Sequence, residues 1–116
     1  MGYQNQAWLD QWREPVIEPD QLICDPHHHL WDHITHRYLL DEFKQDIDSG
    51  HRVVSTVFVE CASMYNVDAA VALAPVGETE FVNGVAAMSA SGAYGTERIA
   101  AGIVGFADLM LGRKVA

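Results

Sequence analysis

The segment best suited to chemistry is 25–32, which reads Asp-Pro-His-His-His-Leu-Trp-Asp. Side chains two positions apart on an extended chain point to the same side, so His27 and His29 should share one face and His28 the other. Two neighbouring imidazoles can form half of a divalent metal site, for which zinc is the commonest metal. The alternative is that the clustered histidines only hydrogen-bond or cap the end of a strand. The spacing alone leaves both interpretations open.

Two carboxylates follow later apolar runs, as the histidines follow the first. Glu60 comes directly after the run 53–59, and Asp108 comes shortly after the run 99–105. Parallel strands that form a barrel gather catalytic groups at their carboxyl ends, so we predict Glu60 and Asp108 as catalytic residues on the same rim as the histidines. The competing interpretation is that each carboxylate caps a helix or is solvated in a loop, the commoner role for an acidic residue after a strand.

An alternation of strands and helices has to position these residues. The apolar runs 22–24, 53–59 and 99–105 predict buried strands, the first of them interrupted by Pro26 and the histidines. Between them, residues 39–49 and 78–92 carry apolar side chains at helical spacing, with Glu78 and Thr79 as candidate caps of the second helix. The order strand, helix, strand, helix, strand predicts an α/β fold with a parallel sheet.

The flanking segments are less regular. Residues 7–14 predict a short amphipathic helix in which Trp8 and Trp12 lie one turn apart and pack, and Pro15 ends it. Residues 66–77 fit a loop or a short helix equally well, and 109–116 would begin another helix.

Four further side chains have a predicted structural role. Cys24 and Cys61 each lie in or beside an apolar run, which favours buried thiols over a disulfide. His33 and His36 belong to a polar loop before the first predicted crossover helix, where we expect them to be structural or solvated.

Composition limits the class of partner. The chain is 49% hydrophobic and 20% charged, as in an ordinary globular protein, and its 116 residues fit a single domain, 1–116. Its formal net charge of −9 disfavours nucleic acid and anionic membranes as partners. The opening residues lack the pattern of a secretory leader, and no apolar run is long enough to cross a membrane, so we predict a cytoplasmic protein.

Taken in order, these motifs resemble the amidohydrolase-related hydrolases (amidohydrolase family 2) with a metal-dependent TIM-barrel fold. The branch concerned includes sugar-lactone and pyrone-dicarboxylate lactonases. Its members open with Asp-x-His-x-His, matched by Asp25, His27 and His29, and often continue as His-Leu-Trp-Asp. The resemblance goes on through residues 37–40, 56–60, 75–84 and 102–105, and so covers most of the chain from Pro19 onward.

The resemblance implies a fold and a site. A (β/α)8 barrel typically needs about 250 residues, so a chain of 116 would supply only its first βα units. His27 and His29 resemble the first two ligands of a catalytic divalent metal, with zinc the favoured ion and water the attacking group. The branch also includes lactonases regarded as metal-independent, in which such histidines would hydrogen-bond the substrate. The family's further histidines and late aspartate have no counterpart in the chain.

The function predicted for the full-length parent is therefore hydrolysis of a small-molecule lactone, or of a related carboxylic ester or amide, by water attack at the barrel rim. A decarboxylase or hydratase of the same superfamily is the nearest alternative chemistry. An alternative of another class is a catalytically incomplete fragment that serves as an interaction module or forms a homo-oligomer. Because such a fragment lacks neighbouring strands, we expect apolar surface to stay exposed at Ile99, Ile103 and Val104 on the edge and at Phe58 and Val59 on one face.

Overall fold

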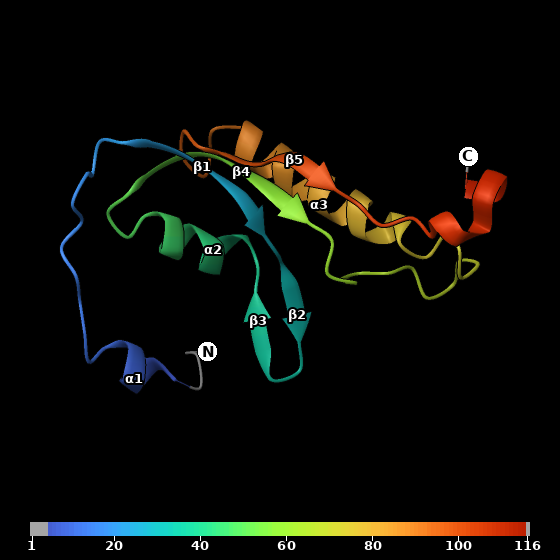
Figure 1. Cartoon of the computed structure of the whole chain (residues 1–116), viewed down its shortest axis with the longest axis horizontal. Helices are drawn as coiled ribbons and strands as arrows, with labels where there is room; N and C mark the ends of the chain where they lie inside the picture. The colour runs from blue at the N-terminus through green and yellow to red at the C-terminus, as the bar shows by residue number, and fades with distance from the viewer. Residues whose placement is uncertain (1–4, 116) are drawn as a thin grey trace.

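The computed structural model describes residues 5–115, and Figure 1 shows a twisted sheet flanked by helices, a separate hairpin and an N-terminal arm. We predicted one domain that spans residues 1–116, of which residues 1–4 and 116 lie outside the described part of the chain. None of the helices described is long and apolar enough to cross a membrane. The elements are, in order, α1 (Gln6–Leu9), β1 (Leu22–His28), β2 (Trp31–His33), β3 (His36–Tyr38), α2 (Leu40–Ile47), β4 (Arg52–Val59), α3 (Val76–Ala90), β5 (Arg98–Val104) and the 3-10 helix η1 (Leu109–Val115).

The main sheet has three parallel strands in the order β1-β4-β5. Leu22 pairs with Arg52 at the start of β1, and Phe58 pairs with Ile103 towards the end of β5. The predicted α/β class with a parallel sheet is confirmed. Because all three strands are parallel, their carboxyl ends lie at one rim of the sheet, as Figure 1 shows.

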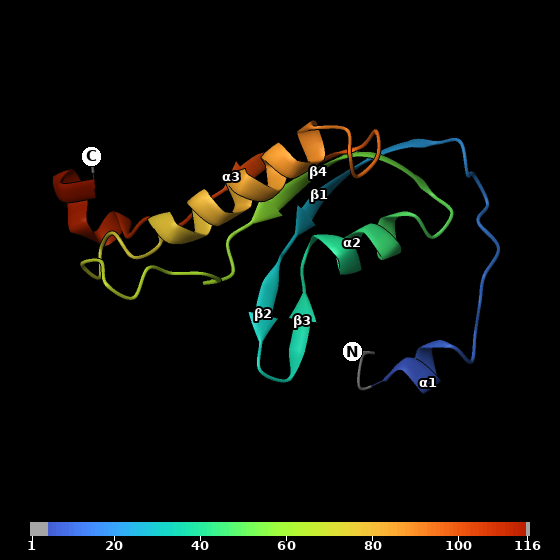
Figure 2. The same cartoon turned by 180° about the vertical axis from the view of Figure 1, so that it is seen from behind.

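One face of this sheet packs against both long helices. Leu40, Phe43 and Ile47 of α2 join one buried cluster with Val82 and Val85 of α3, which confirms the apolar stripes predicted for these helices. Seen from behind in Figure 2, α3 runs along the sheet. This cluster contains the buried apolar side chains of the described chain, and through Phe58 it packs β4 against the helices.

The predicted apolar exposure is only partly correct. Phe58 is completely buried and Ile99 is 1% exposed, because both belong to the cluster under the helices and not to an uncovered face or edge. Val104 is 49% exposed, and Val59 and Ile103 are half-buried. Of the five residues for which we predicted exposure, only Val104 is exposed.

Several predicted boundaries are wrong. Strand β1 continues through Pro26 to His28, because the irregular register between Asp25 and His28 accommodates a residue without an N–H. Helix α3 begins at Val76, so Glu78 lies inside its first turn and does not cap it. The predicted start of a further helix at 109–116 is a 3-10 helix kinked at Gly112.

The N-terminal helix is shorter than predicted and does not pack. It spans only Gln6–Leu9, and the side chains of Trp8 and Trp12 are 69% and 76% exposed. Four residues cannot offset the cost of nucleating a helix unless the helix packs against something, and α1 has no buried residue. The packing role predicted for these tryptophans is therefore wrong.

The predicted polar loop around His33 and His36 is an antiparallel hairpin. Strands β2 and β3 pair Trp31 with Tyr38 and His33 with His36, and the indole Nε1 of Trp31 donates to Nδ1 of His36 at 3.1 Å. This hairpin places an aromatic cluster beside the end of β1.

Two glycines of α3 provide a test of the packing between this helix and the loop after β4. A Cβ at Gly77 would lie 2.5 Å from the carbonyl oxygen of Met64, whereas a Cβ at Gly84 would meet nothing within 4 Å. Alanine in an open helical position stabilises by about 0.5–1 kcal/mol relative to glycine, so Gly84→Ala should raise the free energy of unfolding. Gly77→Ala should lower it by about 1–3 kcal/mol because backbone atoms must move. Urea unfolding measures the free energy of unfolding of both variants. A Gly77→Ala protein more stable than the wild type would contradict the close approach of α3 to the Met64 carbonyl.

Candidate functional site

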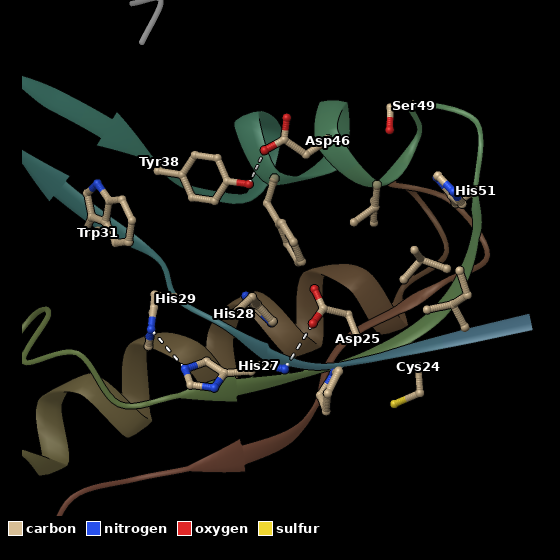
Figure 3. A pocket seen from close by; sticks show the side chains of 15 residues that line it. Cys24, Asp25, His27, His28, His29, Trp31, Tyr38, Asp46, Ser49 and His51 are labelled. Atoms are coloured by element: carbon tan, nitrogen blue, oxygen red, sulfur yellow. Dashed lines mark hydrogen bonds between the residues drawn. The ribbon is translucent and has the colours of Figure 1, made fainter. Parts of the chain in front are cut away.

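His27 and His29 meet at the carboxyl end of β1. Their Nε2 atoms lie 3.2 Å apart, and the ring centroids are 4.9 Å apart in an edge-to-face arrangement. Figure 3 shows the two rings pointing towards one another while His28 lies apart from them. The predicted alternation of the three histidines is confirmed, and it brings two ring nitrogens to one point in space.

A backbone contact fixes the tautomer of His29. Its Nδ1 lies 2.7 Å from the carbonyl oxygen of Val59, at the end of the neighbouring strand β4. Since a carbonyl only accepts, Nδ1–H is the donor, and a neutral ring then carries its lone pair on Nε2. The sheet thereby orients the free nitrogen of His29 towards His27. A carbonyl partner on the other ring nitrogen is the usual support of a histidine that binds a metal.

His28 is a buried structural residue. It is 6% exposed, its ring stacks on Phe43 of α2 at 4.2 Å, and its Nε2 lies 2.9 Å from the hydroxyl of Thr56. Its Nδ1 is buried without a hydrogen-bond partner among the described residues. Desolvation lowers the pKa of His28 to about 4, against a partial opposing effect of Asp25, so the ring is neutral at physiological pH.

His27 and His29 fit two of the ligand positions of a metal site. Two nitrogens bound to one tetrahedral zinc ion at 2.0–2.1 Å would lie about 3.3 Å apart, close to the separation of the two Nε2 atoms. Within residues 5–115, however, no group of three or more His, Cys, Asp or Glu side chains is arranged to hold a metal ion. A catalytic zinc needs three protein ligands, so the described chain offers an incomplete ligand set.

The two predicted carboxylates lie after the strands where we expected them. The backbone N–H of Glu60 donates to the carbonyl of Val104 at 2.9 Å and so continues the β4–β5 ladder. The Asp108 carboxylate is exposed and accepts from the N–H of Met110 at 3.0 Å, which caps η1. Neither carboxylate forms a described hydrogen bond with His27 or His29. Their catalytic roles therefore stay predictions, and Asp108 has the capping role that we weighed against catalysis.

A buried acid that we took for a helix cap organises the loop after β4. Glu78 is 1% exposed, and its Oε2 accepts from the N–H groups of Cys61 at 3.1 Å and Ser63 at 2.6 Å. Two residues of this loop, Ala62 and Met64, have positive φ values of 62° and 54°. The carboxylate thus holds a strained turn at the rim. The sequence has no local signal for this role, because Glu78 stands beside Thr79 and Glu80 at the start of the predicted helix.

Both cysteines are free, as predicted, but only one is shielded. Cys24 is exposed, which corrects its predicted burial, because β1 is an outer strand that pairs only with β4 in the described chain. Cys61 is half-buried, and its thiol donates to the carbonyl of Leu30 at 3.5 Å. Burial, reinforced by the carboxylate of Glu78, raises the pKa of Cys61, so its thiol is a poor nucleophile.

A groove of about 730 Å³ runs along β1 beside the histidines (Figure 3). Apolar and aromatic side chains line it, together with four histidines and two carboxylates, and no lysine or arginine of the described chain. Its lining includes Ile23, Asp25, Phe43, Asp46, Ile47 and Val53.

In comparisons with known proteins, no family model, no curated sequence and no solved structure matches the chain. The resemblance to amidohydrolase-related enzymes therefore rests on the motifs of the chain alone.

Proposed function

We propose that this chain supplies the first βα units of a (β/α)8 barrel and the first two site histidines of a hydrolase that acts on a lactone or a related carboxylic ester or amide. The observation that carries the proposal is the 3.2 Å approach of the Nε2 atoms of His27 and His29. Their position at the carboxyl end of a strand, in a parallel sheet whose strands follow chain order, is the arrangement that barrel enzymes use for catalytic groups.

In this proposal the two imidazoles act together at one reacting centre. His29, held by the Val59 carbonyl, presents a fixed lone pair, and His27 presents its own Nε2 from the same face. A bound zinc ion would make water a stronger nucleophile and polarise the carbonyl. Without a metal, a protonated Nε2 of His27 can donate to the carbonyl oxygen of the substrate. Glu60 and Asp108 remain candidates for moving the proton, next to acidic groups from further strands.

A second candidate function is an interaction module without catalysis. It is favoured by the incomplete ligand set of the described residues. A decarboxylase or hydratase with the same two histidines is the remaining alternative, because one scaffold of this kind supports several reactions.

Cobalt(II) titration tests the two-histidine site. We expect the 116-residue chain to bind cobalt or zinc weakly, with a dissociation constant on the order of 0.1 mM or above, because two ligands are too few for a tight site. His27→Ala and His29→Ala should each abolish this binding, whereas the matched control His33→Ala, which removes an exposed hairpin histidine, should retain it. The titration is read from the visible spectrum of the bound cobalt.

Hydrolysis is tested separately, on a set of γ- and δ-lactones. The chain alone should be inactive, and a longer polypeptide that contains it should lose at least about 100-fold in kcat/KM when His29 becomes alanine. Retained lactone hydrolysis in that variant would refute the proposed role. A tight one-to-one zinc site in the chain alone would instead show a complete ligand set.

A further inference from the structure

The face that carries His27 and His29 continues beyond the end of β1. His28 and Leu30 are buried, at 6% and 0% exposed. His27, His29 and Trp31, which alternate with them, keep accessible surface. The period of two that brings the histidine pair together therefore also places Trp31 on their side of the chain. The ring centroids of His29 and Trp31 lie 6.4 Å apart, and Figure 3 shows both side chains beside the ribbon that leaves β1 for the hairpin.

The hairpin adds three more rings to this face. Residues that pair directly across an antiparallel hairpin point to the same side, and so do residues two apart in one strand. Trp31 pairs with Tyr38 and His33 pairs with His36, so these four rings, the ring row, share one face. The rings of His33 and Tyr38 are tilted by 18° and 32° from the Trp31 ring, with centroids 6.1 Å and 5.6 Å from it. Three of the rings are half-buried and His33 is exposed, so the ring row presents accessible ring surface that leads outward from the site histidines.

The two charged residues of the hairpin strands lie on the opposite face. Asp32 pairs with Arg37 between the two pairs of rings, so both side chains point away from the ring row. The Arg37 guanidinium donates to the Glu42 carboxylate from Nε at 2.9 Å and from Nη2 at 2.7 Å, and is thus engaged on the far side. Because the ring row contains no carboxylate, lysine or arginine, it suits an uncharged ligand better than an anion.

The polar ends of the two largest rings are used within the chain. The indole N–H of Trp31 donates to Nδ1 of His36 at 3.1 Å, and the Tyr38 hydroxyl donates to the Asp46 carboxylate. These two side chains therefore offer a ligand the faces and edges of their rings, which bind flat unsaturated rings by stacking. They offer few partners to the hydroxyl groups of a sugar ring, which need hydrogen bonds when they leave water.

We propose that the ring row is a substrate subsite, which binds the flat, uncharged ring of an aromatic or conjugated lactone while the scissile carbonyl lies at His27 and His29. Trp31 is the specificity-determining residue because it lies between the histidine pair and the outer ring of His33. This inference rests on the proposed lactone hydrolysis and narrows its substrate class. A saturated or polyhydroxylated lactone loses the stacking and is the poorer ligand.

Binding of coumarin to the 116-residue chain tests the subsite without turnover. Coumarin is a flat, uncharged aromatic lactone, and octahydrocoumarin has the same skeleton with saturated, puckered rings. The indole N–H signals of the three tryptophans are followed by NMR. Coumarin should shift the Trp31 signal saturably and leave those of Trp8 and Trp12, which are 69% and 76% exposed, unchanged. It should bind at least about fivefold more tightly than octahydrocoumarin.

Variants of the chain tie this binding to the ring row. Trp31→Leu should weaken coumarin binding at least about fivefold, whereas the matched control Trp12→Leu should bind it like the wild type. His33→Ala removes the exposed outer ring and should weaken binding about two- to threefold, and His33→Phe restores a ring and should recover it. Circular dichroism confirms that each variant is folded, and the His33 pair keeps the test decisive if Trp31→Leu does not fold.

Several results would overturn the subsite. Equal shifts of all three tryptophan signals would show that coumarin binds any exposed ring. Equal affinity for octahydrocoumarin, or unchanged binding in both Trp31→Leu and His33→Ala, would exclude stacking on the ring row. Tighter binding of the anionic coumarin-3-carboxylate than of coumarin would contradict the uncharged class of ligand. Because coumarin binding needs neither metal nor turnover, the subsite can be refuted while lactone hydrolysis by a longer polypeptide is confirmed, and the reverse.

Discussion

Replacing Glu78 by alanine is expected to lower the free energy of unfolding by about 2–5 kcal/mol. The carboxylate accepts from two backbone N–H groups, those of Cys61 and Ser63, at a position that is 1% exposed. Removing it leaves both donors without a partner, at about 1–3 kcal/mol each, and opens a cavity. The positive φ angles of Ala62 and Met64 then lose the contact that holds them. Urea unfolding followed by circular dichroism measures the loss.

Two variants make the result specific. Glu80→Ala removes an exposed acid from the same helix and should change stability by less than about 0.5 kcal/mol. Glu78→Gln keeps one acceptor oxygen and should lie between the wild type and the alanine variant. If Glu78→Ala were as stable as Glu80→Ala, the carboxylate would not hold the loop, and the organisation of the rim around Glu60 would need another cause.

The sequence predicts the sheet and its helices well because burial makes their patterns regular. Strand β4 is paired on both edges and buries Thr56 and Phe58 under the helices, so a β-branched, apolar run from Val53 correctly predicts a buried strand. Helix α2 buries one stripe and therefore shows apolar residues at helical spacing. In both cases local composition and tertiary environment agree, and the prediction follows from either.

The prediction fails where the segment is too short or too irregular to show a periodic pattern. The hairpin formed by β2 and β3 has only three residues in each strand, too few to show a period, and the indole–imidazole hydrogen bond helps to join them. Strand β1 passes through Pro26 because the pairing with β4 tolerates an irregular register there. Neither feature has a local signal that outweighs proline and polar residues.

The candidate site, too, was predicted only in part. The period of two along an extended strand is enough to place His27 and His29 together, and the structure confirms it. It does not reveal that the Val59 carbonyl sets the tautomer of His29, or that His28 packs on Phe43. Those contacts come from β4 and α2, whose positions depend on the whole fold.

The stability of the protein should fall on acidification because of His28. The pKa of this histidine is about 4 in the folded chain and about 6.5 when unfolded, since burial penalises the imidazolium. Above pH 6.5 the ring is neutral in both states and has no effect. Between pH 6.5 and 4 only the unfolded chain takes up the proton, so the free energy of unfolding declines, by an amount on the order of 2–3 kcal/mol, and below pH 4 this decline ends.

A variant that cannot titrate separates His28 from the other acid-sensitive groups. His28→Phe preserves stacking on Phe43 and removes the imidazole, whose Nδ1 has no partner among the described residues, so the decline between pH 6.5 and 4 should flatten. The Thr56 hydroxyl still accepts from the N–H of Ala100 at 2.9 Å, which limits the cost of losing His28. His33→Phe replaces an exposed histidine and should keep the wild-type pH dependence. Urea unfolding at half-unit pH steps supplies the curves, and an unchanged slope in His28→Phe would show that another group binds the proton.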